Sequence, residues 1–446
     1  PDVSYKFNLP QRVKTRFNIG LSYNIPNLAD LTLAFERGNE VRFSFVFRGN
    51  FLKSDTFLKS DPPKINYKKS EKLANDDDRL LYILDNLKKE NIFFQSGEFK
   101  NDELSVSVSQ SRFRSQPLAY GRTARVLVEA ASKETNKINI NLMNGDIETS
   151  RFTFPKENFK RLIELEISPS EILQSSSLIS STDTNEYKNH SFQPKVNFPE
   201  IFWSMTPAFR HHVGGPEAFY MGQLWWQVNA DLKLRRNLTL SSVIGFDIYN
   251  NFDELKLKSN SRLPHVRSDI QEYLKEGKNN IARLKLDYFW SPYNDWFARL
   301  DFGLIEEMFG GVGGEILYRP FDSNFAFGLT SHIVKQRDFD QKFTFRDYKT
   351  FTGHISSYIK LPKQILMQIH AGKYLAKDKG ITLDLSRRFE TGFRLGVFAT
   401  RTNISKELFG EGSFDKGFYF EIPLETFFGN YRTDSINFSL HPLTRD

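Results

Sequence analysis

The sequence of 446 residues contains no cysteine, which excludes disulfide bonds and thiolate metal sites. This absence fits an export route, where free thiols risk oxidation. No apolar run approaches the roughly 18 residues of a membrane-spanning helix, and mean hydropathy is −0.48. A helical membrane anchor is therefore excluded within this sequence. A membrane-spanning β-barrel is not, because half of each barrel strand is polar.

The sequence also lacks a leader and a nucleic-acid-binding motif. Pro1 to Leu9 is polar, without initiator Met or the apolar core of a signal peptide, and 441–446 stops on polar residues. We therefore expect a mature protein or a piece of one, truncated at its C-terminus. Lys and Arg number 61 against 54 Asp and Glu, but the charges are scattered with mixed signs. We expect no nucleic-acid partner, because the basic residues form no stripe.

Strand-sized segments in which apolar and polar residues alternate fill the sequence from about Phe202 to Leu440. Successive side chains on a strand point to opposite faces, so each segment has one apolar and one polar face. An outer-membrane β-barrel, apolar outside and polar inside, repeats this pattern strand after strand. A soluble β-sandwich gives the same alternation. An aromatic content of 15%, with 43 Phe and 17 Tyr, favours the barrel, whose lipid face and interfacial girdles need aromatic rings.

The alternation assigns individual side chains to the two faces. The apolar phase, which we expect outward, includes Leu284, Leu286, Leu300, Phe302, Leu383 and Leu385. The charged phase, which we expect inward, includes Asp231, Lys233, Asp247, Lys285, Asp287, Arg299, Asp301 and Asp384. Such an interior could contact a hydroxyl-rich polysaccharide through many weak polar bonds. Charges that pair and merely stabilise the interior explain the pattern equally well.

The lengths of the connections between the expected strands predict that the two rims of the barrel differ. Tight turns are expected at 235–237, 292–295, 321–324 and 390–392, and long polar connections at 250–280 and 335–349. Outer-membrane barrels have short turns on one rim and long loops on the other. Two charged groups are candidate sugar- or cation-binding sites: Glu306, Glu307 and Glu315 around the glycines of 310–314, and Arg337, Asp338 and Asp340 in the second long connection. A solvated rim explains the first group, and a self-paired loop surface explains the second, which lacks the spacing of a calcium loop.

The N-terminal part of the chain divides into different zones. Three short alternating segments at 17–25, 29–36 and 40–48 are too few for a barrel of their own. We expect residues 1–52 to be the terminal strands of a truncated first barrel. Residues 53–77 are rich in Lys, Asp, Ser and Pro and are expected to form a linker.

Between the two strand zones the hydrophobic period changes. Amphipathic helices around Leu80–Leu87 and 117–131 and a hairpin over Asn144-Gly145 predict a small α+β domain at 78–167. We expect this domain on the periplasmic side, because its exposed backbone cannot sit in lipid. A Ser- and Asn-rich linker at 168–200 then leads to the second barrel at 201–446.

The chain offers no recognisable catalytic or metal site. The glycines of 310–314 are followed by a strand rather than a helix, so they do not form a phosphate loop and are expected to mark close packing or a bend. His211 and His212 would point to opposite faces of a strand and could not share a metal. We therefore expect no catalytic residues, no metal and no cofactor.

Several separate blocks of sequence resemble one family. They are GGPEAFY at 214–220, LPHVRSD at 263–269, EEMFGGVGGE at 306–315, YRPFD at 318–322, KQRDFD at 335–340, GEGSFDKG at 410–417 and LTRD at 443–446. These blocks, with AFERGN at 34–39, resemble the YjbH/GfcD family of outer-membrane exopolysaccharide (capsule) biosynthesis proteins.

The resemblance implies two barrel regions separated by a small periplasmic-type domain, in a protein that serves capsule or exopolysaccharide production. It brings no catalytic residues with it. We expect a non-enzymatic protein of the Gram-negative outer membrane that takes part in polysaccharide export or assembly. Its expected partners are outer-membrane lipid, the exopolysaccharide and other proteins of the export system. The alternative is a secreted polysaccharide-binding or polysaccharide-degrading β-sandwich protein.

Overall fold

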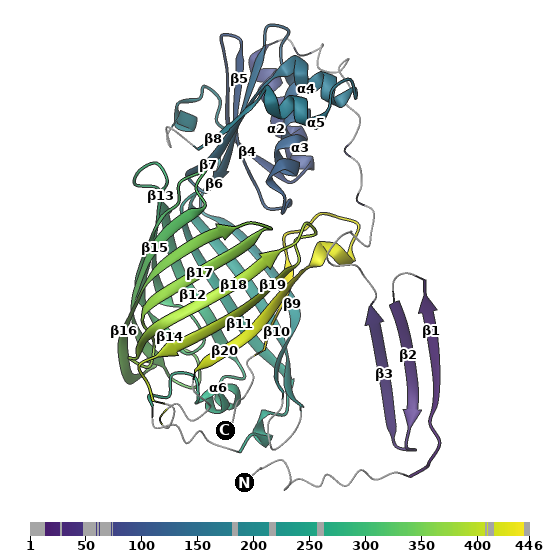
Figure 1. The fold of residues 1–446 in the computed structure, drawn as a ribbon, viewed down its shortest axis with the longest axis vertical. Helices are drawn as coiled ribbons and strands as arrows, with labels where there is room; N and C mark the ends of the chain where they lie inside the picture. Colours follow the sequence, from purple (N-terminus) through teal and green to yellow (C-terminus); the bar gives the residue numbers. More distant parts are fainter. Residues whose placement is uncertain are drawn as a thin grey trace.

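The computed structural model describes residues 14–26, 29–47, 59, 62, 73, 75–180, 186–213, 220–256, 263–405, 408 and 414–440. Most of the expected linker at 53–77 and the family-like residues at 214–219, 410–413 and 443–446 lie outside these ranges. The chain is mainly β, as expected, and forms sheets of three, five and thirteen strands (Figure 1). No helix in the part of the chain described has the length and apolar character needed to cross a membrane.

The three-stranded sheet lies at the N-terminal end of the chain. It is an antiparallel meander of β1 (Ile19–Ile25), β2 (Ala29–Glu36) and β3 (Glu40–Phe47), which confirms the three expected strands. The register sets Leu33 beside both Leu21 and Phe43, so apolar side chains share one face. These three side chains are 55–80% exposed, so the described residues place no covering layer on that face.

The five-stranded sheet carries helices and has its own core. Its strands, in spatial order, are β4 (Ile92–Lys100), β5 (Glu103–Gln110), β6 (Lys137–Asn144), β7 (Ile147–Pro155) and β8 (Ser177–Ile179). The helices are α2 (Asp76–Lys89), α3 (Gln116–Ala130), α4 (Lys156–Ile163) and α5 (Pro169–Gln174). Ile83 of α2, Leu127 of α3 and Ile138 of β6 are fully buried in one cluster, so helices and sheet share a core. We call this part the α+β unit.

Helix α2 begins slightly earlier than its apolar pattern predicted. Asn75 caps it, because its side-chain oxygen accepts a hydrogen bond of 2.8 Å from the amide of Asp78. Asp76, Asp77 and Asp78 therefore lie inside the first turn, where their charges favour the positive end of the helix dipole. The expected hairpin over Asn144-Gly145 is confirmed as β6 and β7.

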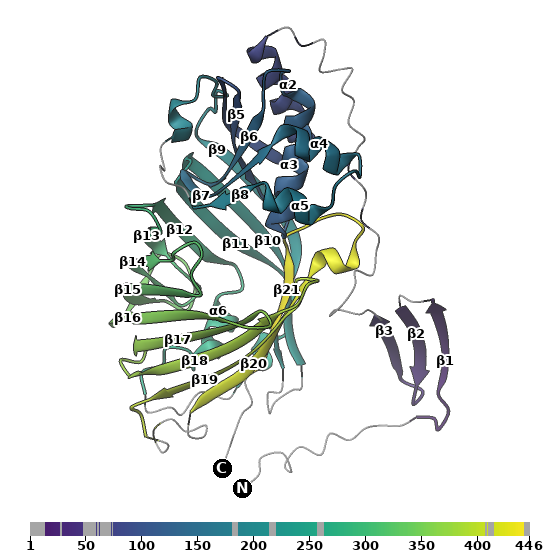
Figure 2. The same cartoon turned by 45° about the horizontal axis from the view of Figure 1, so that its top comes forward.

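The thirteen-stranded sheet is an antiparallel meander in which every strand pairs with its neighbours in sequence. Its strands are β9 (Glu200–Val213), β10 (Tyr220–Arg235), β11 (Leu238–Asn250), β12 (Asn280–Trp290), β13 (Trp296–Leu304), β14 (Phe309–Tyr318), β15 (Phe325–Arg337), β16 (Phe345–Leu361), β17 (Ile365–Lys373), β18 (Lys379–Arg388), β19 (Arg394–Thr402), β20 (Asp415–Pro423) and β21 (Ser435–Leu440). The sheet is strongly curved (Figures 1 and 2). Over the residues described, no pairing joins β9 to β21, so closure into a barrel stays a prediction.

The two faces of this sheet differ in chemistry, as the alternation predicted. The register sets Leu286 opposite Phe302 on one face and Asp287 opposite Asp301 on the other. Leu300 and Phe302 are 52% and 65% exposed, whereas Asp301 is 2% exposed. The apolar residues therefore face away from the protein, and the charged residues lie on the concave side.

The strand connections form two rims. The turns at 236–237, 291–295, 319–324 and 389–393 lie on the rim beside the α+β unit, which we call the domain rim, and this matches the expected tight turns. The connection between β11 and β12 lies on the opposite rim and contains α6 (Ile270–Glu276), so we call it the α6 rim. The predicted long loop at 335–349 is wrong in its bounds: β15 continues to Arg337 and β16 begins at Phe345, which leaves only 338–344.

Candidate functional site

A network of charges crosses four strands on the concave face. Lys285 of β12 lies 2.8 Å from Asp287, and Arg299 of β13 lies 3.6 Å from Asp301 and 3.4 Å from Glu315 of β14. His332 of β15 completes it, with Nε2 3.1 Å from both carboxylate oxygens of Asp301. The structure thus brings five of the predicted residues together, and every carboxylate in the network has a basic neighbour.

Gly313 makes room for the histidine of this network. It lies between Asp301 and His332 in the register, and a Cβ atom built on it would lie 2.0 Å from Cδ2 of His332. The glycines of 310–314 thus serve close packing here, as predicted for this segment. Sequence reasoning missed His332, because only the register across β14 brings it to Asp301.

The other charged residues expected inward lie apart from this network. Asp231 and Lys233 are on β10 near the domain rim, where they face Phe202 and Glu200 of β9. The remaining two accept hydrogen bonds from neutral neighbours. Asp247 accepts from Gln223 at 2.7 Å, and Asp384 accepts from Gln368 at 3.2 Å and from the hydroxyl of Tyr419 at 2.9 Å.

The acidic residues of the connections do not form the expected common clusters. Glu306 pairs with Arg267 at 2.7 Å, Glu307 pairs with Arg210 of β9, and Glu315 belongs to the network above. The contact from Arg210 to Glu307 joins the first strand of the sheet to the connection between β13 and β14, across the concave side. In the residues that the structure covers, no three His, Asp or Glu side chains come together to hold a metal ion.

Residues 337–340 hold their own loop in place. Arg337 is fully buried and donates to the backbone carbonyls of Glu306, Gln341 and Lys342. Asp338 accepts from the amide of Phe339 at 2.9 Å, and Asp340 accepts from the amide of Lys342 at 3.0 Å. The three side chains thus bond to backbone groups, and the buried Arg337 does not fit the self-paired loop surface given as the alternative.

Helix α6, in the long connection between β11 and β12, packs against the concave face at the α6 rim (Figure 2). Tyr273 of α6 is fully buried among Met308, Phe309 and Val334. Its hydroxyl donates to the carbonyl of Arg337 at 2.6 Å. Burial raises the pKa of Tyr273 to about 12, so the hydroxyl stays protonated at neutral pH. The α6 segment is therefore a fixed part of this rim.

A cavity of about 590 Å³ lies between the α6 segment and the wall of the sheet. Its lining includes His332 of β15, His354 of β16, Thr400 of β19 and the connection between β17 and β18. Within the described part of the chain, Nε2 of His354 and Oδ1 of Asp378 are buried without a hydrogen-bond partner. The ring of Tyr374 meets His354 edge to face at 4.6 Å.

Most of this cavity escaped sequence reasoning. Of the predicted site residues, only Glu306 lines it. No local signal in the sequence joins His354 to Asp378, because His354 is on β16 and Asp378 lies beyond β17, in the connection to β18.

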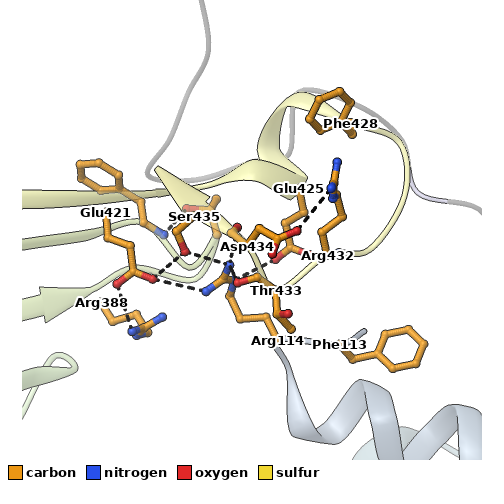
Figure 3. A network of polar contacts seen from close by, with 12 residues as sticks. Phe113, Arg114, Arg388, Glu421, Glu425, Phe428, Arg432, Thr433, Asp434 and Ser435 are labelled. Atoms are coloured by element: carbon orange, nitrogen blue, oxygen red, sulfur yellow. Dashed lines mark hydrogen bonds and ion pairs between the residues drawn. The ribbon is translucent and has the colours of Figure 1, made fainter. Parts of the chain in front are cut away.

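The α+β unit is attached to the domain rim through Arg114 (Figure 3). The guanidinium of Arg114 lies 3.3 Å from Glu425 and 3.5 Å from Glu421. It also donates to the carbonyls of Thr433 and Asp434 at 2.7 and 3.1 Å. These partners belong to the end of β20, the start of β21 and the connection between them, and we call these contacts the Arg114 junction.

Two further contacts support the same attachment. The ring of Phe113 lies 5.3 Å from that of Tyr431, and the hydroxyl of Thr433 donates to the carbonyl of Ser111 at 2.9 Å. Elsewhere on the rim, the hydroxyl of Ser180 donates to Asp295 at 3.2 Å.

Comparison with known proteins identifies the family. A family model described as exopolysaccharide biosynthesis protein YbjH matches residues 4–446. The chain belongs to the YjbH family. An uncharacterized lipoprotein YjbH of Escherichia coli (strain K12) is 31% identical over 452 residues. The match covers 97% of this chain and 63% of that YjbH protein, and it confirms the resemblance seen in the sequence blocks.

Among solved structures, this member of the YjbH family matches two forms of OmpT, an outer membrane protein of Vibrio cholerae. A loop L8 deletion mutant has 6% identity, covering 50% of this chain and 87% of that chain. The in-vitro folded trimer form has 8% identity, covering 51% and 85%. Both have a TM-score of 0.25, which is too low to support an argument.

Proposed function

We propose that this protein is a non-catalytic component of the Gram-negative outer membrane that takes part in the export or assembly of an exopolysaccharide. In this proposal the thirteen-stranded sheet closes as a transmembrane barrel around its polar face. The α+β unit lies in the periplasm, and β1–β3 belong to a preceding barrel region. Partners are outer-membrane lipid, the polysaccharide and other proteins of the export system.

The division of the large sheet into two faces carries the proposal. Exposed Leu and Phe side chains on the convex face have no covering protein layer among the residues described, and lipid is the environment that removes such side chains from water. The concave face offers carboxylates, hydroxyls and amides that form hydrogen bonds with sugar hydroxyls. Family membership supplies the link to exopolysaccharide, and the name of the E. coli relative as a lipoprotein supports a place in the cell envelope.

The rims support an orientation. Five tight turns lie on the domain rim, at 236–237, 291–295, 319–324, 362–364 and 389–393, and short turns are typical of the periplasmic side of outer-membrane barrels. The α+β unit has a water-exposed surface and a core of its own, so we place it in the periplasm with that rim. The α6 rim then faces the cell surface.

The pairing of acidic with basic side chains in the network on the concave face supports a non-catalytic role. The carboxylates of the network are neighbours of Lys285, Arg299 and His332, and this pairing stabilises fixed charges rather than a proton donor. We therefore propose that the network contacts a passing polysaccharide or stabilises the interior.

The proposal is tested by deleting the gene in its natural host. We expect less secreted or surface polysaccharide, with synthesis still taking place. The triple variant Asp287→Asn, Arg299→Gln, Asp301→Asn should reproduce part of that loss. It should still migrate differently on a gel before and after heating, which shows that the barrel assembles. Asp384→Asn is the matched control, because Asp384 lies on the same face outside the network. Normal export in the deletion strain, or glycan hydrolysis by the purified protein, would contradict the proposal.

A further inference from the structure

We propose that the cavity at the α6 rim binds one or two units of a neutral or amino sugar. This inference rests on the proposed function for the source of the sugar, which would be the exopolysaccharide. The cavity itself is defined by the structure alone. Its volume of about 590 Å³ falls within the roughly 300–1,000 Å³ of small-molecule sites.

Unpartnered polar atoms point to a polar ligand. Buried polar side-chain atoms in proteins nearly always have a hydrogen-bond partner. Oδ1 of Asp378 and Nε2 of His354 belong to cavity-lining residues and have none among the residues described. A carboxylate oxygen only accepts, so the ligand has to supply a donor to Asp378, either a hydroxyl or an ammonium group. An apolar ligand would leave both atoms without a partner.

The rest of the lining matches the two surfaces of a sugar ring. Hydroxyls of Thr352, Thr400 and Thr402 supply donors and acceptors for sugar hydroxyls. The ring of Phe414 and the aliphatic side chains of Leu375 and Ile404 supply apolar surface for the C–H groups. The lining thus combines hydrogen-bonding groups with a larger apolar surface, and a sugar ring presents hydroxyls and C–H faces to match both.

Charge restricts the class of sugar. Among the lining residues, Arg267 is the one guanidinium, and it pairs with Glu306. Asp378 and Asp415 add two more carboxylates. These three carboxylates outnumber the one guanidinium, and this excess of negative charge repels uronic acids and other anionic sugars. Neutral hexoses, deoxyhexoses and protonated hexosamines meet no such repulsion.

Binding is measured by saturation-transfer NMR on the 446-residue chain folded in detergent micelles. The probes are D-glucose, D-galactose, D-mannose, L-fucose, L-rhamnose, N-acetylglucosamine and glucosamine, with glucuronate and galacturonate as anionic counterparts. We expect saturation transfer to at least one of the neutral or amino sugars, and none to glucuronate or galacturonate. Absence of transfer to the whole panel, or equal transfer to uronates, would overturn the proposal.

Variants then locate the binding. Asp378→Asn and Ala376→Trp, the second of which fills the cavity from its lining, should weaken binding at least tenfold. Asp384→Asn is the matched control: it makes the same chemical change on the concave face outside the cavity, and its affinity should equal that of the wild type. Equal loss in Asp378→Asn and Asp384→Asn would show binding elsewhere on the concave face and refute the assignment.

The binding result is independent of the test of function. Sugar binding that depends on Asp378, together with normal polysaccharide export in the deletion strain, would keep the cavity assignment and remove the export role. Defective export in that strain, with no sugar bound by the purified chain, would keep the export role and remove the cavity assignment.

Discussion

The Arg114 junction predicts that one side chain of the α+β unit stabilises the last hairpin of the large sheet. Arg114 and Glu425 have side chains that are only 17% and 11% exposed, so water screens their contact poorly. Replacing Arg114 by Ala removes contacts to two carboxylates and two carbonyls. A hydrogen bond to a charged group contributes about 1.5–3 kcal/mol, and part of this is recovered when water enters.

We therefore expect Arg114→Ala to lower the free energy of local opening by about 2–4 kcal/mol, which raises the opening constant roughly 30- to 700-fold. Amide hydrogen exchange over 424–440 measures this opening. Strand β21 should lose protection, while the central strands β13 to β16 keep theirs. Arg114→Lys should recover only part of the stability, because an ammonium cannot reach all the partners of the planar guanidinium.

Arg161→Ala is the control for this experiment. Arg161 pairs with Glu166 at 3.4 Å on the exposed surface of the α+β unit, and neither residue belongs to the Arg114 junction. It should leave exchange over 424–440 unchanged. If Arg114→Ala also leaves that exchange within about threefold of the wild type, a difference worth less than about 1 kcal/mol, the stabilising role of the junction is refuted.

Further predictions concern the membrane face, the orientation and one buried tyrosine. Leu300→Arg puts a charge on the exposed apolar face and should cost about 2–4 kcal/mol if that position lies at the bilayer midplane, measured as lost folding into lipid vesicles; folding equal to the wild type would contradict the membrane assignment. Protease added to intact cells should leave residues 78–167 uncut, and cleavage there would place the α+β unit outside the cell. Burial raises the pKa of Tyr120 to about 12. Below about pH 10 both folded and unfolded states keep its proton, so the contribution of Tyr120 to stability should be lost between about pH 10 and 12, by about 2–3 kcal/mol, as the unfolded state ionises first. Tyr120→Phe should lessen that loss in alkaline unfolding curves, and an unchanged curve would contradict the assignment.

Sequence reasoning succeeded for those features that depend on short-range pattern. The alternation around Leu286 and Leu300 predicted their face, because a period of two is a local property of a strand. The end of β15 was missed for the opposite reason. Lys335 to Arg337 is a charged stretch without a strand pattern, but the amide of Arg337 donates to the carbonyl of Met308 at 2.8 Å, and this tertiary contact extends the strand.

The candidate site was predicted only where its residues are close in sequence. Lys285 and Asp287 are two residues apart on one strand, so their pairing follows from the alternation. His354 and Asp378 meet at the cavity because an entire hairpin folds between them. In the sequence Arg114 is likewise an ordinary loop residue. Its partner Glu421, at the end of β20, lies about 300 residues later, and only the fold brings the two together. Such contacts depend on the three-dimensional arrangement, which local periodicity does not contain.

The place of the α+β unit has a consequence for chain entropy. Phe192 is bridged to Gly97 of this unit, so the unit holds the chain shortly before β9 begins. Through Arg114 the same unit holds the chain where β21 begins. For a flexible chain of about 240 residues, bringing two ends together costs about 5 kcal/mol by the (3/2)RT ln n relation. In the proposed barrel, an α+β unit that holds both segments keeps the two ends of this stretch of chain together, so much of this entropy cost no longer opposes the pairing of β9 with β21.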